Sequence, residues 1–317
     1  MCLLEGIKVS KGEAAFEPAG IGRIETGGEP KSRSLWLDGW RRLKKNRLAM
    51  LGLVLVLFMI FLAIFAPFVA PYDPIEQLIW TEGKSVRLAP PSAKHWFGTD
   101  LYGRDILSRT IYGTRISLTI AVAASVVSLV IGVTLGAVAG YYGGRVDGSI
   151  SWLINVIYAF PFLLFVLSIV AFRPASLGLV YVAIGFVSWP SIARVVRGQV
   201  LSIKETEFVE AARAVGAEDF KVIFRHILPN VIAPVIVQIT LGMGSMIMIE
   251  ASLTFLGFGT QPPTPSWGYM INQGKDYLLS GQWWWSVFPG AAISLTVLGF
   301  NLLGDGLRDA LDPRLNK

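Results

Sequence analysis

Six long apolar stretches limit what this chain can fold into more than any other feature of its sequence. The first, LAMLGLVLVLFMIFLAIFAPFV, covers residues 48–69 and contains no charged side chain. About 20 apolar residues in an α-helix, at about 1.5 Å per residue, are enough to cross the hydrocarbon core of a bilayer. The sequence therefore predicts an all-α polytopic membrane protein with six transmembrane helices. The other five stretches lie at about residues 113–140, 151–171, 176–193, 231–257 and 286–306.

The composition supports this class and excludes others. Hydrophobic residues make up 53% of the 317 residues and charged residues 16%, against about 25% charged residues in a typical soluble domain. One cysteine, Cys2, leaves no internal disulfide. The two histidines, His95 and His226, fall on opposite sides of the membrane in the predicted topology, which argues against a histidine-based metal site. The net charge of +6 is better explained by membrane topology than by nucleic-acid binding.

The distribution of basic residues predicts the orientation in the membrane. The cluster WRRLKKNR, at residues 40–47, directly precedes the first span. With both termini in the cytoplasm, 20 of the 28 Lys and Arg residues lie on the cytoplasmic side, as the positive-inside rule requires. The first external segment, about 71–112, carries several of the other eight and weakens the bias. Residues 1–34 show no periodicity and predict a flexible cytoplasmic tail, with no apolar stretch typical of a secretory signal.

The stretch ETEFVEAARAVGAEDFKVIFRHILPN, residues 205–230, is rich in charge although it lies between two apolar spans. A first short helix can start at Ser202, with Glu205 completing a capping box. Gly216 can adopt the left-handed conformation that closes a helix, and Pro229 is expected to stop a second helix before the next span. The apolar residues of each arm recur at helical spacing: Phe208, Ala211, Ala212 and Val215 in the first, and Phe220, Ile223, Phe224 and Ile227 in the second.

Two interpretations of this hairpin are open from periodicity alone. It could be an amphipathic connector that rests on the membrane surface. It could equally be a peg for a soluble partner, because an alanine pair allows close approach and the neighbouring carboxylate can pair with a cation. A peg that is joined to two spans would transmit force into the membrane.

Several motifs carry a resemblance to a known family. Glu210-Ala211-Ala212, followed by Gly216 and then Leu228-Pro229, resembles the EAA loop of bacterial ABC-importer permeases. His226 stands where the general family pattern has isoleucine, but RHILPN is similar to the peptide-importer branch. Five further segments resemble the second permease of dipeptide and oligopeptide importers: FGTDLYGRDILSRTIYGTRISL (97–118), YYGGRVD (141–147), EASLTFLGFG (250–259), PSWGYMI (265–271) and LRDALDPRL (307–315).

The resemblance implies a fold, partners and a role for the hairpin. It implies the ABC type I importer permease fold, with a first transmembrane helix and extracytoplasmic loop at 35–112 and a five-helix core at 113–317. The EAA coupling loop would occupy about residues 198–230 and form coupling helices that dock on ATP-binding subunits. The expected partners in the cell membrane are a homologous second permease, two ATP-binding subunits that hold ATP and magnesium, and an extracytoplasmic substrate-binding protein.

Glu250 is the ionisable residue deepest within the predicted spans. An intramembrane acid is costly and usually faces a cavity or a partner group. It could contact a substrate amine, or it could serve a structural or gating role, which we favour. Its position toward the outer end of its span predicts partial access to water.

Other residues predict details of packing. Gly132, Gly136 and Gly140 form a small-residue ridge that allows close helix packing, within the chain or against another subunit. Pro161 and Pro190 lie inside predicted spans and can kink them. The external charges could pair to order their loop or present a surface to a binding protein, and we favour the first: Asp100, Arg104, Asp105 and Arg109.

Motifs that would give the chain a catalytic role of its own are absent from the sequence. It contains no G-x-x-x-x-G-K-[ST] loop, no H-E-x-x-H, no Cys/His metal spacing and no G-x-S-x-G. We therefore expect a non-catalytic transport subunit without a cofactor of its own, energised by another chain. A secondary transporter would show more intramembrane charge, and a membrane enzyme would need clustered polar groups. Peptides are the expected cargo, with nickel or oligosaccharides as the alternative in similar permeases.

Overall fold

The computed structural model describes residues 35–172 and 176–312. Within these ranges the chain forms helices and loops and no β-strand, apart from an isolated bridge between Thr99 and Asp105. The predicted all-α fold is confirmed. The tail predicted for residues 1–34 lies outside the described residues. From Leu35 onward the chain forms one compact unit.

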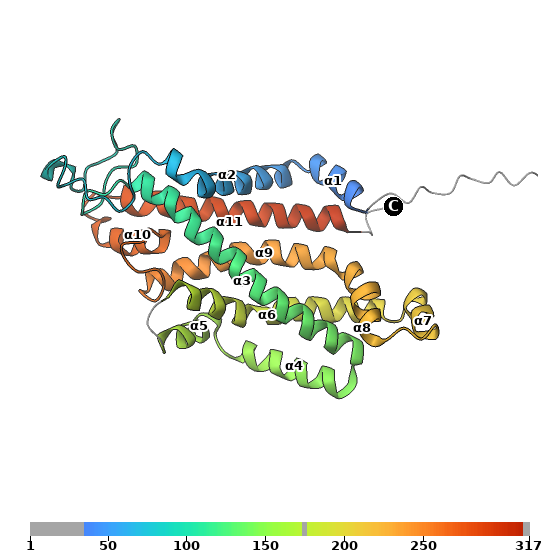
Figure 1. Cartoon of the computed structure of the whole chain (residues 1–317). Coiled ribbons are helices and arrows are strands. Elements are labelled where there is room, and N and C mark those ends of the chain that lie inside the picture. Colours follow the sequence, from blue (N-terminus) through green and yellow to red (C-terminus); the bar gives the residue numbers. More distant parts are fainter. Residues whose placement is uncertain (1–34, 173–175, 313–317) are drawn as a thin grey trace, which may run out of the picture. The chain divides into compact units, whose positions relative to one another are not determined.

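The long helices lie side by side along a common direction (Figure 1). Helix α3 packs chiefly against α6, and α11 packs against both α2 and α9. The α-helices are α1 (Leu35–Lys45), α2 (Arg47–Val69), α3 (Ile106–Tyr142), α4 (Gly144–Ala159), α5 (Phe162–Ala171), α6 (Leu177–Ile203), α7 (Glu207–Ala214), α8 (Asp219–Lys221), α9 (Leu228–Phe255), α10 (Trp267–Gly274) and α11 (Trp284–Leu311). A π-helical segment (Val222–Ile227) joins α8 to α9, and short 3₁₀ turns occupy Lys84–Val86 and Lys275–Tyr277.

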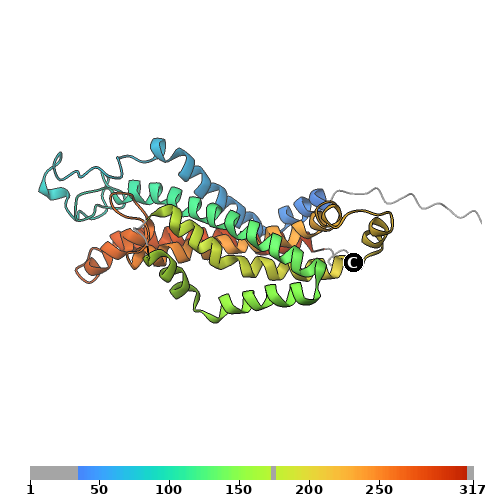
Figure 2. The same ribbon diagram turned by 60° about the horizontal axis from the view of Figure 1, so that its bottom comes forward.

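Within residues 35–172 and 176–312, five helical stretches are long and apolar enough to cross a membrane: α2, α3, α6, the stretch Asp219–Phe255 that contains α9, and α11. The predicted third span is not one helix, because α4 and α5 meet at 87° (Figure 2). Phe160 is extended (φ −91°, ψ 139°), as a residue before proline prefers to be, and Pro161 has no amide hydrogen with which to continue the ladder. The kink expected at Pro161 is therefore confirmed, and within the described residues the predicted six spans are obtained when the bent pair α4 and α5 counts as one broken span. Pro190, in contrast, lies within the continuous helix α6.

Helix α3 begins earlier than hydropathy indicated. The side chain of Asp105 accepts a hydrogen bond from the backbone amide of Ser108 (2.8 Å), which caps the helix at Ile106. The first turns contain Ser, Arg and Thr, so an apolar window did not include them. The division expected between the first helix with its loop (35–112) and the five-helix core (113–317) therefore falls inside α3.

The three glycines of the ridge lie at the contact between α3 and α6. A Cβ added to each would collide with α6: at 2.7 Å from Ile192 Cβ for Gly132, 2.5 Å from the Ala193 carbonyl oxygen for Gly136, and 2.8 Å from Val200 Cβ for Gly140. Real Cβ atoms do not come this close, so the missing side chains let the two backbones approach. The ridge thus packs within this chain.

The charged residues Asp100, Arg104, Asp105 and Arg109 order the segment between α2 and the first turns of α3 from within. Asp100 is fully buried, and its carboxylate lies 2.6 Å from Arg104 Nε and 3.8 Å from Arg109 Nε. The buried Arg109 guanidinium also donates to the carbonyl oxygen of Pro74 (2.9 Å). Buried charges require such partners because desolvation is costly. The prediction that these charges order the loop is confirmed.

We expect Gly136→Ala to destabilise the chain by about 1–3 kcal/mol, because the added methyl group would force α3 away from the Ala193 carbonyl. Thermal denaturation of the purified chain in detergent would show a lower midpoint. Gly198→Ala is the matched control on α6, since a Cβ there meets no atom within 4 Å. Equal midpoints for the two variants would contradict the packing role of the ridge.

Candidate functional site

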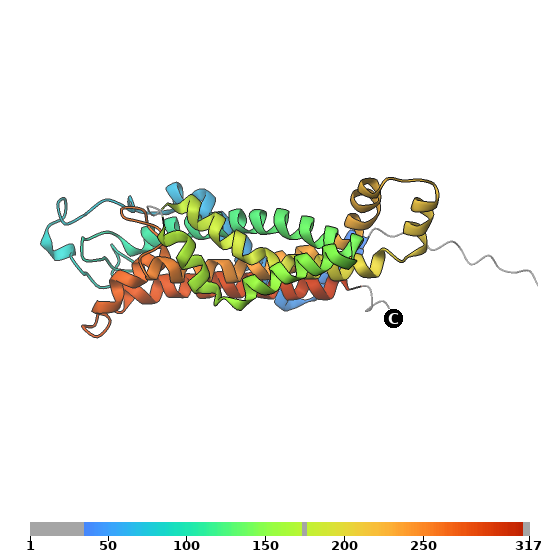
Figure 3. The ribbon, with the colours of Figure 1, turned by 90° about the horizontal axis from the view of Figure 1, so that it is seen from below.

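The segment between α6 and α9 forms a helical hairpin, defined here as residues 204–227. It lies beyond the ends of α3 and α6, at the end of the bundle opposite to α10 (Figures 1 and 3). Its first arm is α7, and its second arm is α8 with the π-helical segment. The structure therefore contains the two-armed element that the sequence predicts.

The first arm begins later than predicted. Helix α6 continues to Ile203, and Thr206 is the N-cap residue of α7. The hydroxyl of Thr206 donates to the carbonyl oxygen of Ile203 (2.6 Å), which closes the end of α6. The predicted capping box at Ser202 and Glu205 is wrong, because Ser202 lies inside α6 and its backbone is already helical.

The turn between the arms is a Schellman motif centred on Gly216. The amide of Ala217 donates to the carbonyl oxygen of Ala212 (3.1 Å), and the amide of Gly216 donates to that of Arg213 (2.9 Å). Gly216 has φ +84°, a conformation that other residues adopt only with strain. The predicted left-handed glycine is confirmed.

Pro229 does not stop the second arm. Residues from Asp219 to Phe255 form one helical stretch that passes through the π-helical segment into α9. Pro229 lies in the first turn of α9, and Asn230 Nδ2 donates to the carbonyl oxygen of His226 (2.7 Å) at this junction. A local π-helical turn re-pairs backbone groups around such a break. The predicted stop is therefore wrong, and the second arm is rigidly continuous with a membrane span.

The buried side of the hairpin differs from the predicted apolar faces. Val209, Val222 and Ile227 are fully buried and pack with Val196 and Val200 of α6. The predicted face of the first arm is instead largely exposed: Phe208 is 47% exposed and Val215 is 90% exposed. In the second arm, Ile223 and Ile227 are buried, whereas Phe220 and Phe224 are exposed and their tilted rings contact each other, with ring centroids 4.3 Å apart.

This exposed side forms a shallow apolar hollow of about 500 Å³ between the two arms. It brings together Ala211, Ala212 and Gly216 of the predicted coupling residues. Glu210 lies on the exposed surface of α7 outside the lining, Leu228 is half-buried below the hairpin, and Pro229 is exposed. The complete lining is Phe208, Ala211, Ala212, Val215, Gly216, Ala217 and His226.

Charged residues of α7 lie outside the lining of the hollow. Glu207 and Glu210 lie in the first turn of α7, where the helix dipole stabilises carboxylates, and Arg213 lies in its last turn, over the ring of Tyr141. An exposed apolar surface is typical of a protein-docking site. His226 is the lining residue to which sequence reasoning gave no role, since its position on the hollow depends on how the two arms fold together.

Glu250 lies away from this site and is fully buried in α9. Its Oε1 accepts a hydrogen bond from Thr254 Oγ1 (2.8 Å), and Thr254 Oγ1 in turn accepts one from the amide of Thr260 (3.2 Å). These bonds join the end of α9 to the turn that follows it. The predicted access of Glu250 to water is wrong in this chain, because neighbouring helices cover it. A role in gating stays a prediction.

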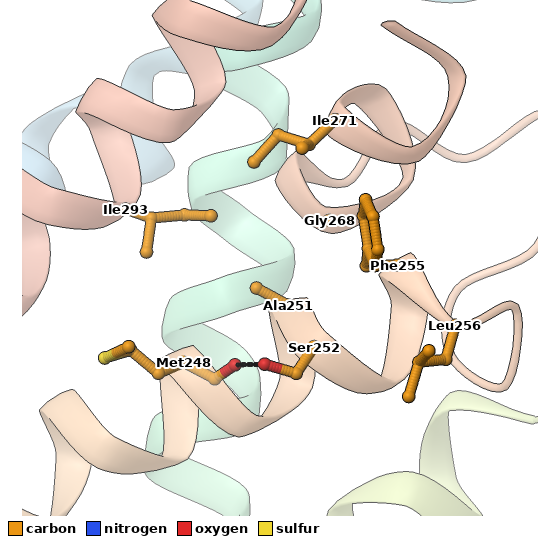
Figure 4. Close-up of a pocket in the computed structure, with 8 residues that line it drawn as sticks. All are labelled: Met248, Ala251, Ser252, Phe255, Leu256, Gly268, Ile271 and Ile293. Atoms are coloured by element: carbon orange, nitrogen blue, oxygen red, sulfur yellow. Dashed lines mark hydrogen bonds between the residues drawn. The ribbon is translucent and has the colours of Figure 1, made fainter. Parts of the chain in front are cut away.

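Another face of α9 lines an apolar groove of about 350 Å³ together with α10 and α11 (Figure 4). The hydroxyl of Ser252 donates to the carbonyl oxygen of Met248 (2.8 Å), so it is satisfied within its own helix. The groove therefore offers van der Waals contact without charge. Its lining is Met248, Ala251, Ser252, Phe255, Leu256, Gly268, Ile271 and Ile293.

Residues 132–317 match the family described as the binding-protein-dependent transport system inner membrane component. Residues 34–91 match the N-terminal transmembrane domain of oligopeptide transport permease C. The chain therefore belongs to the family of inner membrane components of binding-protein-dependent transport systems.

Curated relatives and solved structures agree with this assignment. The dipeptide transport system permease protein DppC of Bacillus subtilis (strain 168) is 46% identical over 286 residues, which are 90% of this chain and 88% of that protein. The glutathione transport system permease protein GsiD of Shigella flexneri serotype 5b (strain 8401) is 44% identical over 284 residues, 89% of this chain and 92% of that protein. A structure of the inward-facing MetNI methionine ABC transporter matches with a TM-score of 0.54 at 18% identity, covering 65% of this chain and 98% of the matched one. The fold is that of an ABC importer permease.

We expect Gly216→Ala to lower the free energy of local opening of the hairpin turn by about 1 kcal/mol, because alanine is strained at φ +84°. Hydrogen exchange of the amides at residues 216 and 217 would be about fivefold faster. Gly148→Ala, in α4 and free of contacts within 4 Å, is the control. Unchanged exchange in the hairpin would show that the turn does not depend on glycine.

Proposed function

We propose that this chain is the transmembrane permease subunit of an ATP-driven importer of short peptides, and that its hairpin docks on an ATP-binding subunit. The observation that carries the proposal is the exposed hollow between the arms, which Ala211, Ala212 and Gly216 line, with Glu210 exposed on the same helix α7 outside the lining. Among the residues that the structure describes, no element covers the exposed side chains of Phe208 and Val215. Relatives across nearly the whole length are dipeptide and glutathione permeases.

The continuity of the hairpin with two membrane helices supports a mechanical role. Its first arm follows α6 after three residues, and its second arm continues into α9. In the proposed cycle, ATP-binding subunits that close on ATP and magnesium move the hairpin and turn the path outward. An extracytoplasmic binding protein then delivers its peptide, and hydrolysis returns the inward-facing state. This chain contributes the lever and part of the path, with a homologous permease completing it.

The proposed orientation places the hairpin and both termini in the cytoplasm. The positive-inside bias supports it, since 20 of 28 Lys and Arg residues then face the cytoplasm. The buried network around Asp100 and helix α10 lie together at the other end of the bundle, which is then extracytoplasmic (Figure 3).

The proposed substrate class is short peptides, because the relatives include permeases for a dipeptide and for glutathione, itself a tripeptide. The groove and the hollow contain no cluster of charges that would select a metal ion. Within residues 35–172 and 176–312, no group of three or more His, Cys, Asp or Glu residues is arranged to hold a metal. Selection among peptides is assigned to the binding protein.

We expect Glu210→Lys to lower copurification of the co-expressed ATP-binding subunits at least tenfold, because truncating or reversing one partner of an interfacial charge pair costs about 2–5 kcal/mol. Glu76→Lys, an exposed acid at the opposite end of the bundle, is the control. Equal recovery for both variants would contradict docking at the hairpin. Labelling of Val215→Cys from outside intact cells would also contradict it.

We expect the complete complex in proteoliposomes to accumulate a labelled dipeptide in the presence of ATP and its binding protein. A protonophore that collapses the ion gradient should leave uptake within about twofold of the untreated rate, because the proposed energy source is hydrolysis. Uptake that stops with the protonophore and continues without ATP would identify a secondary transporter instead.

A further inference from the structure

Tyr141, in the last turn of α3, touches both arms of the hairpin. Its hydroxyl donates a hydrogen bond to Asp219 Oδ1 at the start of α8 (2.6 Å). The guanidinium carbon of Arg213, in the last turn of α7, lies 4.8 Å from the centroid of the Tyr141 ring. The Tyr141 side chain is buried. The side chain of Tyr141 on α3 therefore contacts both arms of the hairpin, at Asp219 and at Arg213.

These contacts are directional and stronger than apolar packing alone. A hydrogen bond to a carboxylate is about twice as strong as one between neutral groups, and a guanidinium is attracted to the face of an aromatic ring. The Tyr141 ring belongs to the buried cluster that contains Val209 and Val222, whereas Asp219 and Arg213 are exposed. Among the described residues, Tyr141 makes the polar side-chain contacts between α3 and the hairpin.

The hairpin is joined to the other membrane helices in a different way. It continues α6 through residues 204–206, and it runs into α9 without a break. The neighbouring ion pair between Arg197 and Asp147, with Nη2 to Oδ2 at 2.6 Å, joins α6 to α4 and does not involve the hairpin. Helix α3 is not adjacent to the hairpin in the chain; it meets the hairpin through the apolar cluster that contains Ala137 and through the polar contacts of Tyr141.

Helix α3 is one continuous helix from Tyr141 to its cap at Asp105, at the other end of the bundle (Figure 1). Along the way its glycine ridge is pressed against α6, and its first turns carry Arg109 of the buried external network. A displacement of its hairpin end therefore reaches the opposite end of the bundle.

We propose that Tyr141 is a positioning residue that transmits hairpin movement to α3 through Asp219 and Arg213. The inference rests on the proposed function, in which ATP-binding subunits move the hairpin. Loss of the Tyr141 hydroxyl leaves the docking surface intact, because Tyr141 does not line the hollow. ATP hydrolysis then continues while less of the movement reaches the transport path.

The test uses the complete complex in proteoliposomes and measures peptide transported per ATP hydrolysed. Tyr141→Phe removes one hydroxyl and keeps the ring, and we expect the ratio to fall at least about fivefold, the factor that loss of a charge-assisted hydrogen bond produces. Tyr142→Phe is the matched control, because Tyr142 is exposed and only meets Tyr141 edge-on. Its ratio should equal that of the unmodified complex.

Variants of the acceptor test the same bond from the other side. Asp219→Ala should reproduce the loss, and combining it with Tyr141→Phe should add little, since both remove one interaction. Asp219→Asn keeps an acceptor oxygen and should retain most of the coupling.

Three outcomes separate this inference from the proposed function. An unchanged ratio in Tyr141→Phe overturns the inference, and so does loss of copurification of the ATP-binding subunits in that variant, because Tyr141 would then act in docking. Failure of the unmodified chain to copurify with ATP-binding subunits overturns the proposed function itself.

Discussion

The close contact between α3 and α6 is the interaction on which the rest of the structure depends. Three glycines remove the side chains that would hold the backbones apart, and Ile192, Ala193 and Val200 occupy the space. In a bilayer, where lipid is as apolar as leucine, such close packing is a main source of helix association. Because α6 leads into the hairpin and α3 ends beneath it, this contact also sets where the hairpin lies.

Polar interactions at the two ends of α3 add to its apolar contact with α6. At one end, Asp100 and Asp105 are buried and bonded within the chain. At the other end, Tyr141 meets Asp219 at the base of the hairpin. The hairpin combines a buried underside, which anchors it in its own bundle, with an exposed apolar hollow, which is the surface proposed for docking.

Local patterns predicted the features that depend on near neighbours in the chain. Hydropathy located the apolar stretches because a bilayer requires about 20 apolar residues in succession. Gly216 was predicted to be left-handed because a helix that ends there needs φ above zero. Where the reasoning failed, a competing local rule prevailed: Ser202 continues α6 instead of capping a new helix, and Pro229 is accommodated by a π-helical turn rather than ending a helix.

The sequence alone determined the class of fold, the number of apolar stretches and the family, because these depend on composition, spacing and motif order. The tertiary structure decided which faces are covered. Phe208 and Val215 belong to the apolar residues at helical spacing in the first arm, yet they are exposed, while Val209, which is outside that spacing, is buried against α6. Periodicity identifies an apolar face without saying what covers it. The meeting of Tyr141 with Asp219, 78 residues apart in the chain, likewise follows only from how the helices pack.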